Sequence, residues 1–377
     1  MRAMGRKPTK YLNLPPRMRA RDRRGVVWYY YDAGGKPRKE IPLGKDYTVA
    51  VGKWAELEGN QTNTSQLLFF KDAADRYLRD VLPTKAERTR RDNLIELDWL
   101  LKFFNNPPAP LAEIQPINIR QYMDWRVDQS KKRLLDDNAE RIKAGKSPLE
   151  FTGREGKVRA NREKALFSHI WNKAREWGLT DRPNPCAGIK GYSETGRDIY
   201  IEDEVFEAVW QAGCQSMRDA MDLAYLTGQR PDDVISASEL DIKKGALEFN
   251  QGKTGKKLRI EIVGELDTLI KRIKARKESY KVHTLALICT ETGRPLTQSN
   301  YRDRFDKARE AAAKANPKLA DDIRKFQFKD LRAKAGTDKA ESSGDIRQAQ
   351  KQLGHTTIAM TEHYTRDRRG DLVKPTK

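Results

Sequence analysis

The stretch that decides the fold runs from Lys329 to Tyr364 and reads KDLRAKAGTDKAESSGDIRQAQKQLGHTTIAMTEHY. It contains Arg332, then a Gly-His pair ending at His355, then Tyr364 on a short predicted helix. Cationic and neutral donors of this kind can surround one phosphate group, and a phenol oxygen can serve as the nucleophile. The stretch therefore predicts a phosphoryl-transfer site, which requires a second arginine and a proton donor upstream.

Both missing groups occur upstream of this stretch. Gly-Gln-Arg-Pro places Arg230 in a tight turn between two predicted helices, with Pro231 suited to opening the second. Asp233 lies one helical turn further on, where it can orient the guanidinium. Lys253 lies in the turn QGKTGKK of a predicted hairpin, and its ammonium group can deliver a proton to a leaving oxygen. Considered alone, this lysine is more simply an ordinary turn residue.

Attack on a phosphodiester by a phenol has two obstacles, a nucleophile whose pKa is about 10 and an alkoxide leaving group. Two arginines can offset the developing negative charge, and a lysine acting as general acid can add roughly two to four orders of magnitude in rate. This chemistry needs no metal. The three cysteines, Cys186, Cys214 and Cys289, lie far apart without the spacing of a zinc site. We expect neither a metal nor a cofactor.

The charge of the chain indicates its partner. Among 377 residues, Lys and Arg exceed Asp and Glu by 20. Such a balance favours a polyanion, nucleic acid before a membrane surface, and the plain alternative is a soluble basic protein with no such partner. The sequence has neither the apolar run of a signal peptide nor a stretch approaching about 18 apolar residues, so we expect a soluble protein of a reducing cytoplasm.

The first 39 residues hold twelve Lys or Arg against two acids, which predicts a mobile arm that binds phosphates. The run GVVWYYYDAGGKPRKEIPLG then predicts a hairpin, a helix follows over 49–58, and the polar residues 59–65 read as a linker. Trp28 and Tyr29 to Tyr31 fit either the core of this small sheet or a surface laid in a DNA groove. The predicted DNA contacts of this segment are Arg2, Arg6, Lys7, Arg17, Arg19, Arg21, Arg23 and Arg24.

The middle segment shows helical periodicity throughout. Four helices are predicted, over 69–81, from Thr84 to Phe104, over 117–126 and over 158–179, with a highly charged insertion over 129–157. His169 reads as a core histidine. The basic residues of this segment fit phosphate contacts or a solvated charged face; the candidates are Lys85, Arg88, Arg90, Arg91, Arg159 and Arg162.

The C-terminal segment predicts mixed structure around the site. A helix over 201–212 precedes one capped by Ser216, and residues 240–262 alternate as a three-stranded antiparallel sheet. Helices follow over 265–279 and 298–315, the second behind the cap Thr297. Lys329 and Arg332 are predicted on one face of a helix start, Asp345 caps a helix ending at Gly354, and Thr356 or Thr357 caps the last helix.

Arg230, Lys253, Arg332, His355 and Tyr364, in this order, resemble the tyrosine recombinase (phage integrase) family, and the motifs TGQR, KTGK, DLR and LGH-to-Y are specific together. The resemblance covers nearly the whole chain. It implies a multidomain, mainly α fold: a small sheet with a helix as an arm-type DNA-binding domain (1–62), a four-helix core-binding domain (66–192), and an α+β catalytic domain with a small antiparallel sheet and a C-terminal tail (198–377).

The resemblance also implies the role of each site residue. Arg230 and Arg332 would clamp the scissile phosphate, Lys253 would be the general acid, His355 would hydrogen-bond a nonbridging oxygen, and Tyr364 would form a 3′-phosphotyrosine. The sequence departs from the family at Lys329, where most members have histidine. A protonated lysine can donate to phosphate but cannot act as a base, so we expect Lys329 to contact the phosphate.

The function implied is site-specific recombination of double-stranded DNA at core and arm sites by a homotetramer, integrating or excising a phage or mobile element. A DNA-bending accessory protein is a possible further partner, and the expected location is the nucleoid of a bacterial host. A type IB topoisomerase-like enzyme and a DNA-binding regulator with a decayed active site are the alternatives. The resemblance implies that the tail after Tyr364 docks on a neighbouring subunit. Leu372 and Val373 are its only apolar anchors, so docking in cis and docking in trans both stay open.

Overall fold

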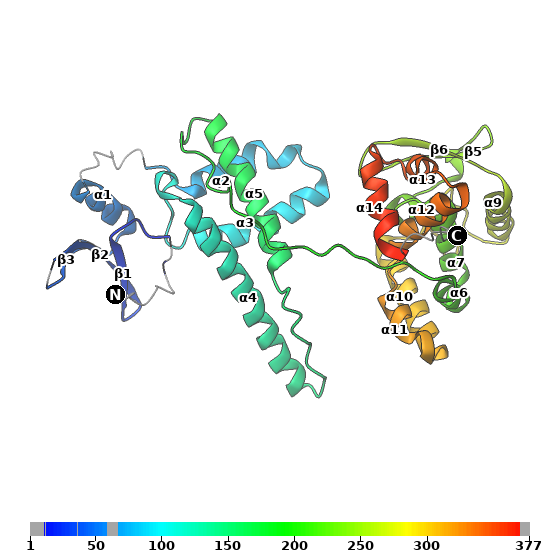
Figure 1. Cartoon of the computed structure of the whole chain (residues 1–377), viewed down its shortest axis with the longest axis horizontal. Helices are drawn as coiled ribbons and strands as arrows, with labels where there is room; N and C mark the ends of the chain where they lie inside the picture. Colours follow the sequence, from blue (N-terminus) through cyan, green and yellow to red (C-terminus); the bar gives the residue numbers. More distant parts are fainter. Residues whose placement is uncertain (1–10, 12, 36, 59–66, 370–377) are drawn as a thin grey trace, which may run out of the picture. The chain divides into compact units, whose positions relative to one another are not determined.

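A computed structural model describes residues 11, 13–35, 37–58 and 67–369. The chain divides into two compact units, Met1–Thr195 and Gly196–Lys377, and each is considered by itself. Figure 1 shows small sheets in both units and helices elsewhere, which agrees with the mainly α multidomain fold predicted from the sequence. Residues 59–65, expected as a linker, and the tail 370–377 lie outside the described residues.

The first unit begins with a three-stranded antiparallel sheet in the order β1-β2-β3, followed by α1. Along β2 the side chains alternate: Tyr29 and Tyr31 are buried, whereas Trp28 and Tyr30 are half-buried. The alternation is the strand period of two, so the aromatic run supplies both the core and part of the surface. The bounds are β1 Met18–Arg23, β2 Val26–Gly34, β3 Lys39–Gly44 and α1 Tyr47–Leu57.

The strand β1 corrects the expected arm. Its residues pair with β2 from Met18 opposite Tyr31 to Arg23 opposite Val26. The sequence predicted a two-stranded hairpin, whereas the sheet has three strands. Arg19, Arg21 and Arg23 therefore belong to an ordered edge strand. The high charge concealed the alternation, because the exposed face of an edge strand can be basic throughout.

The helical part of this unit packs around aromatic side chains. Phe70 and Phe167 stack with ring centroids 4.6 Å apart, and Phe104 and Trp171 are buried beside them. His169 is half-buried and its Nδ1 lies 3.1 Å from the hydroxyl of Tyr77, in line with its expected core role. The bounds are α2 Phe70–Asp80, α3 Glu87–Phe104, α4 Pro116–Lys143 and α5 Lys157–Glu176, with short 3₁₀ turns at Leu82–Thr84 and Leu111–Glu113.

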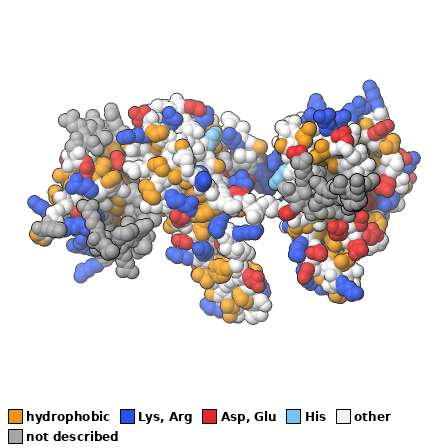
Figure 2. Space-filling model, viewed as in Figure 1, with side chains coloured by type: hydrophobic (Ala, Val, Ile, Leu, Met, Phe, Trp, Pro, Cys, Tyr) orange, Lys and Arg blue, Asp and Glu red, His pale blue; other side chains and the backbone are white. Residues whose placement is uncertain are grey.

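The charged insertion expected over 129–157 is in large part a continuation of α4, which runs to Lys143. The Asn138 side chain accepts from the backbone N–H of Leu149 at 2.7 Å and donates to its carbonyl at 2.9 Å, so the returning segment lies along the helix. Leu135, Ile142 and Phe151 remain exposed on this projection. Figure 1 shows it extending from the helical bundle, and Figure 2 shows hydrophobic side chains at its free end.

The last residues of the first unit are bound to α5 through Asn161. Its Nδ2 donates to the carbonyl of Tyr192 at 2.8 Å and to Oε1 of Glu194 at 2.7 Å, while its Oδ1 accepts from the Tyr192 N–H at 2.8 Å. Arg162 also forms an ion pair with Glu194. The chain is therefore held to α5 up to Glu194, one residue before the second unit is reached.

The second unit combines nine helices with a sheet of order β4-β5-β6 among the described residues. Thr297, Asp345 and Thr357 cap their helices as predicted, whereas Cys214 rather than Ser216 occupies the N-cap of α7. The bounds are α6 Asp203–Ala212, α7 Gln215–Thr227, α8 Pro231–Ile235, β4 Ile242–Lys243, β5 Ala246–Asn250, β6 Lys257–Glu261, α9 Gly264–Glu278, α10 Gln298–Ala315, α11 Ala320–Lys325, α12 Asp330–Ser343, α13 Ile346–Leu353 and α14 Ile358–Arg369, with short 3₁₀ turns at Glu239–Asp241 and Pro317–Leu319.

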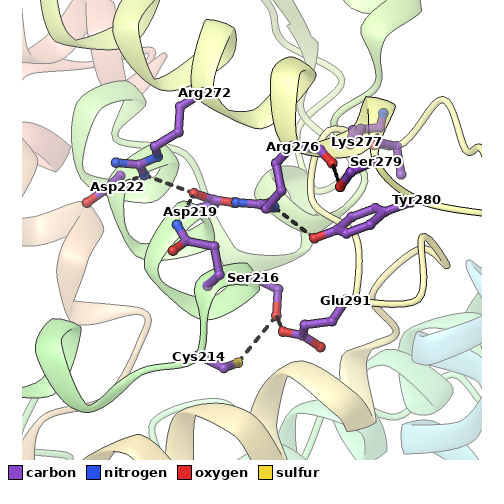
Figure 3. Close-up of polar contacts among 12 residues, drawn as sticks. Cys214, Ser216, Asp219, Asp222, Arg272, Arg276, Lys277, Ser279, Tyr280 and Glu291 are labelled. Carbon is purple, nitrogen blue, oxygen red and sulfur yellow. Dashed lines mark hydrogen bonds and ion pairs between the residues drawn. The ribbon is translucent and has the colours of Figure 1, made fainter.

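A charged cluster joins α7 to α9 (Figure 3). Asp219 is fully buried and forms ion pairs with Arg272, at 2.9 Å, and with Arg276. Asp222, whose carboxyl pKa is raised by burial, accepts from Arg272 at 2.7 Å. Because breaking a buried pair leaves an uncompensated charge, this cluster fixes α9 against α7, the helix that leads to the turn containing Arg230. Below this cluster, the Ser216 hydroxyl donates to Glu291. The prediction that Ser216 caps α7 was therefore wrong.

Candidate active site

Arg230 stands between α7 and α8 as the residue before Pro231. Gly228 ends α7 with a positive φ of 67°, and a Cβ there would approach the Leu353 side chain to 3.0 Å, so both backbone and space require glycine. Arg230 Nη1 donates to Oε1 of Gln251 at 3.0 Å. Asp233 Oδ2 lies 3.9 Å from the same nitrogen, while its Oδ1 accepts from the Gly252 N–H at 3.0 Å.

Gln251 links the arginine turn to the hairpin. Its side chain is buried, its Oε1 accepts from Arg230 and Thr254, and its Nε2 donates to Gln229 Oε1 at 2.8 Å and to the Leu353 carbonyl at 3.0 Å. All four hydrogen bonds available to an amide are therefore made. Gln251, the residue that begins QGKTGK, thus fixes the turn containing Lys253 against two other segments, the turn of Gln229 and Arg230 and the end of α13.

Arg332 lies in the first turn of α12 and is 3% exposed. Its Nη1 donates to the Gly228 carbonyl at 2.8 Å, and its Nη2 donates to the Leu353 carbonyl at 2.6 Å. Its Nε is buried without a hydrogen-bond partner among the described residues. Burial, with the nearby charge of Arg230, lowers the pKa of Arg332 to about 10, so the guanidinium stays charged at neutral pH.

His355 follows α13, which ends at Gly354 with a positive φ of 69°. The imidazole is buried; its Nε2 lies 3.2 Å from Arg332 Nη2, and its Nδ1 lies 3.0 Å from the hydroxyl of Thr361. Burial first, then Arg332 and Arg230, lower the pKa of His355 to about 4. The ring is therefore neutral at physiological pH.

Tyr364 lies on α14, half-buried, with its ring centroid 5.1 Å from that of His355. Interaction with the Tyr364 hydroxyl raises the pKa of Arg332, against the larger effect of burial. Figure 1 shows α12, α13 and α14 side by side. Arg230, Arg332, His355 and Tyr364, which are widely spaced in sequence, thus meet in one place, where two guanidinium groups and a phenol can face one phosphate.

The two lysines predicted for the site, Lys253 and Lys329, are exposed and lie apart from the described hydrogen bonds of these four residues. Lys253 is exposed in the turn between β5 and β6, and Lys329 is exposed at the N-cap of α12. Arg332, three residues later on α12, is buried, so the two side chains differ in exposure. Within the described part of the chain, no hydrogen bond or ion pair joins either ammonium group to the four clustered side chains. Their catalytic roles stay predictions.

The predicted DNA-binding residues lie on the surface where they are described. Arg17, Arg19 and Arg21 are exposed and form ion pairs with Glu58, Asp32 and Glu40. The other described candidates are also exposed except Lys85, which is half-buried; they are Arg23, Arg24, Arg88, Arg90, Arg91, Arg159 and Arg162. Arg2, Arg6 and Lys7 lie outside the described residues. The surface position of this set is compatible with phosphate contacts and does not test them.

Several groups at the site were missed in the sequence. Gln229, Gln251 and Thr361 hold the arginines, the hairpin and the histidine, and the carbonyls of Gly228 and Leu353 accept from Arg332. The two glutamines had a signal, because each is adjacent to a motif already recognised. No group of His, Cys, Asp and Glu in the described residues could hold a metal ion. No helix among them is long and apolar enough to cross a membrane.

The chain is similar to known proteins along nearly its whole length. The phage integrase family model matches residues 201–370. The integrase of Escherichia phage HK022 is 32% identical over 378 residues, covering 95% of this chain and 94% of that protein, and the integrase of Escherichia phage lambda is 25% identical over 378 residues, covering 94% of each. A crystal structure of a lambda integrase dimer bound to a COC′ core site has a TM-score of 0.64 at 21% identity, covering 96% of this chain and 98% of that one.

The family-model match and the relationship to the HK022 integrase make the chain a tyrosine-type site-specific DNA recombinase, and the fold agrees with that assignment. The chain belongs to the phage integrase family, as its identity with the HK022 integrase along nearly its whole length shows.

Proposed function

We propose that this recombinase cleaves and rejoins double-stranded DNA through a 3′-phosphotyrosine at Tyr364, integrating or excising a phage or mobile element. The observation that carries the proposal is that Tyr364 lies beside His355 and interacts with Arg332, while the charge of Arg230 is close to both Arg332 and His355. In the cleavage step a bond forms between the tyrosine oxygen and phosphorus, and the bond from phosphorus to the 5′ oxygen breaks. The ester keeps the energy of the broken bond, so religation needs no nucleotide cofactor.

Each clustered residue has a role that its surroundings support. Arg230 and Arg332 are held by carbonyl and amide oxygens with their charges close together, which favours binding of an anion between them. His355, neutral at pH 7, donates a hydrogen bond to a nonbridging oxygen rather than a proton. Lys253 protonates the leaving 5′ oxygen, and Lys329, exposed beside Arg332, contacts the phosphate.

We propose further that residues 1–62 bind arm sites, that 66–192 bind the core site and that 198–377 carry catalysis. The exposed arginines of β1 and α3 support the first two assignments. A homotetramer would act on two duplexes, with an accessory DNA-bending protein where the arm and core sites must be brought together. A lambda integrase tetramer bound to a Holliday junction has this fold, with a TM-score of 0.63 at 21% identity. The C-terminal tail would dock on a neighbouring subunit.

A covalent-adduct assay tests the proposal. The full chain first selects its core site from a random-sequence duplex library, and that site is then built as a suicide duplex nicked beside the scissile phosphate. We expect a protein–DNA adduct on denaturing gels for the wild type and none for Tyr364→Phe. Thr268→Ala, which removes an exposed hydroxyl of α9 bonded to the Gly264 carbonyl, should form the adduct at the wild-type rate. An adduct in Tyr364→Phe equal to that of the wild type would refute the assignment.

A further inference from the structure

The polypeptide that enters the second unit is bound to the helix that carries Arg332. Arg197 makes two parallel bonds to Asp330: Nε donates to Oδ1 and Nη2 to Oδ2, each at 2.7 Å. Nη2 also donates to the Lys325 carbonyl. Asp330 is 2% exposed, and its Oδ2 accepts from the Gln327 N–H at 2.8 Å, so this carboxylate holds the start of α12 from two sides.

A second set of bonds continues along the same helix. Asp330, Lys334 and Asp338 recur every four residues and therefore form one stripe on α12. The Tyr200 hydroxyl donates to Asp338 Oδ1, and Lys334, which is 2% exposed, donates to the Tyr200 oxygen at 3.0 Å. Lys334 also lies 4.7 Å from the centre of the Tyr200 ring. We call residues 196–200 the strap.

The strap also reaches the helix of the nucleophile. The position of a Cβ on Gly196 lies 3.9 Å from the ring of His363, which precedes Tyr364. One short segment therefore bonds to α12 beside Arg332 and passes near the His363 side chain of α14. The bidentate geometry matters here, because a guanidinium bound at two points fixes the direction of its partner as well as its distance.

We propose that Arg197 is a positioning residue for DNA cleavage: it orients the first turn of α12 so that the guanidinium of Arg332 faces the scissile phosphate. The inference rests on the proposed role of Arg332 as a phosphate clamp. Arg197 acts only through Asp330 and touches no reacting atom. Its loss should slow the cleavage step, because the transition state carries more charge than the bound ground state, while leaving DNA affinity unchanged.

The test compares Arg197→Ala with wild type in two measurements on the full chain, the affinity for the selected core duplex and the single-turnover rate of adduct formation on the suicide duplex. We expect a rate at least about tenfold lower with affinity within about twofold. Arg197→Lys, which keeps the charge but makes one bond, should recover part of the rate. Arg324→Ala, which removes an exposed ion pair on α11, is the matched control and should equal the wild type.

A modified substrate separates positioning from general loosening. When a methyl group replaces one nonbridging oxygen, the scissile phosphate loses its negative charge and depends less on Arg332. The defect of Arg197→Ala should therefore shrink severalfold on this methylphosphonate duplex, as should that of Arg332→Ala. If Arg197→Ala does not fold, the same affinity and rate measurements are made on Arg197→Lys and on Tyr200→Phe. The second of these variants lacks only the strap hydroxyl.

The outcomes are distinct. Cleavage by Arg197→Ala within about twofold of wild type, a parallel loss of affinity and rate, or a defect unchanged on the methylphosphonate duplex would each overturn the positioning role. Wild-type cleavage by Arg332→Ala would instead overturn the proposed active site on which the inference rests.

Discussion

The Nη2 of Arg332 lies 3.2 Å from the Nε2 of His355, and both side chains are buried. An arginine nitrogen can only donate, so the histidine nitrogen facing it accepts. The ring proton then belongs on Nδ1, where it is donated to the hydroxyl of Thr361 at 3.0 Å. Donation from Nε2 to a phosphate oxygen therefore requires that the guanidinium turn toward the phosphate and that the ring change its tautomer.

Thr361→Val tests the tautomer. The substitution keeps the shape of the side chain but removes the acceptor, leaving the Nδ1–H buried without a partner, at a cost of about 1–3 kcal/mol in the free energy of unfolding. We expect the ring proton to move toward Nε2, seen as a change in the two imidazole ¹⁵N shifts. Thr361→Ser keeps the hydroxyl and should resemble the wild type. Identical ¹⁵N shifts in the valine variant would show that Thr361 does not set the tautomer.

The lowered pKa of His355 predicts how stability depends on pH. In the folded state the pKa is about 4, and in the unfolded chain about 6.5. Between these values the unfolded state binds a proton that the folded state does not, so the free energy of unfolding falls as pH drops from 6.5 to 4. The loss is at most about 3.5 kcal/mol, since one pKa unit corresponds to about 1.4 kcal/mol.

Denaturant unfolding of the wild type and of His355→Asn, measured from pH 7.5 to pH 4.5, checks this dependence. Asparagine cannot take up a proton in this range. The difference in unfolding free energy between the two proteins should therefore shrink toward low pH. A difference that stays constant would mean that His355 titrates alike in the folded and unfolded chains.

Gln251→Glu should uncouple the hairpin from the arginine turn. The carboxylate still accepts from Arg230 but can no longer donate to Gln229 and to the Leu353 carbonyl, which leaves both acceptors buried and facing a negative charge. We expect a loss of about 1–3 kcal/mol in unfolding free energy and slower adduct formation. Gln348→Glu changes an exposed amide in the same unit and is the control. Wild-type stability and cleavage in Gln251→Glu would argue against this role.

The role of Lys253 can be tested by changing the leaving group of the DNA substrate. Lys253→Ala should slow cleavage of ordinary DNA by about two to four orders of magnitude if the lysine protonates the 5′ oxygen. With sulfur in place of that oxygen the leaving group needs no proton, so the variant should cleave close to the wild-type rate. Lys256→Ala removes another exposed lysine of the same turn and should cleave both substrates normally. Equal defects on both substrates would exclude proton transfer by Lys253.

The helix ends and turns of the site were predicted correctly from the sequence, because they depend on residues adjacent in the chain. Gly228 and Pro231 bracket Arg230 by local backbone preference, and Asp345 and Gly354 delimit α13 for the same reason. The bonds of Gln251 span up to 102 residues, and Arg197 and Asp330 are 133 apart. Such pairings depend on the tertiary fold, which periodicity does not report.

The errors in the fold have a similar origin. β1 was read as a mobile arm because the charge of its arginines outweighed their alternation, although the pairing of Ala20 with Tyr29 makes it a strand. The length of α4 was underestimated because residues 129–143 are so polar that no apolar face marks them. This part of the helix has ion pairs one turn apart instead, such as Arg133 with Asp137. The Asn138 side chain also hydrogen-bonds to the backbone of Leu149 in the returning segment.

The chain is bonded to its own unit on either side of the boundary. Asn161 holds the chain as far as Glu194 in the first unit, and Asp330 holds it from Arg197 in the second. The bond of Arg197 has a consequence inside the second unit, because Asp330 also accepts from the Gln327 N–H at the start of α12. Any event that pulls Arg197 away would therefore remove one of the two supports of the helix that carries Arg332.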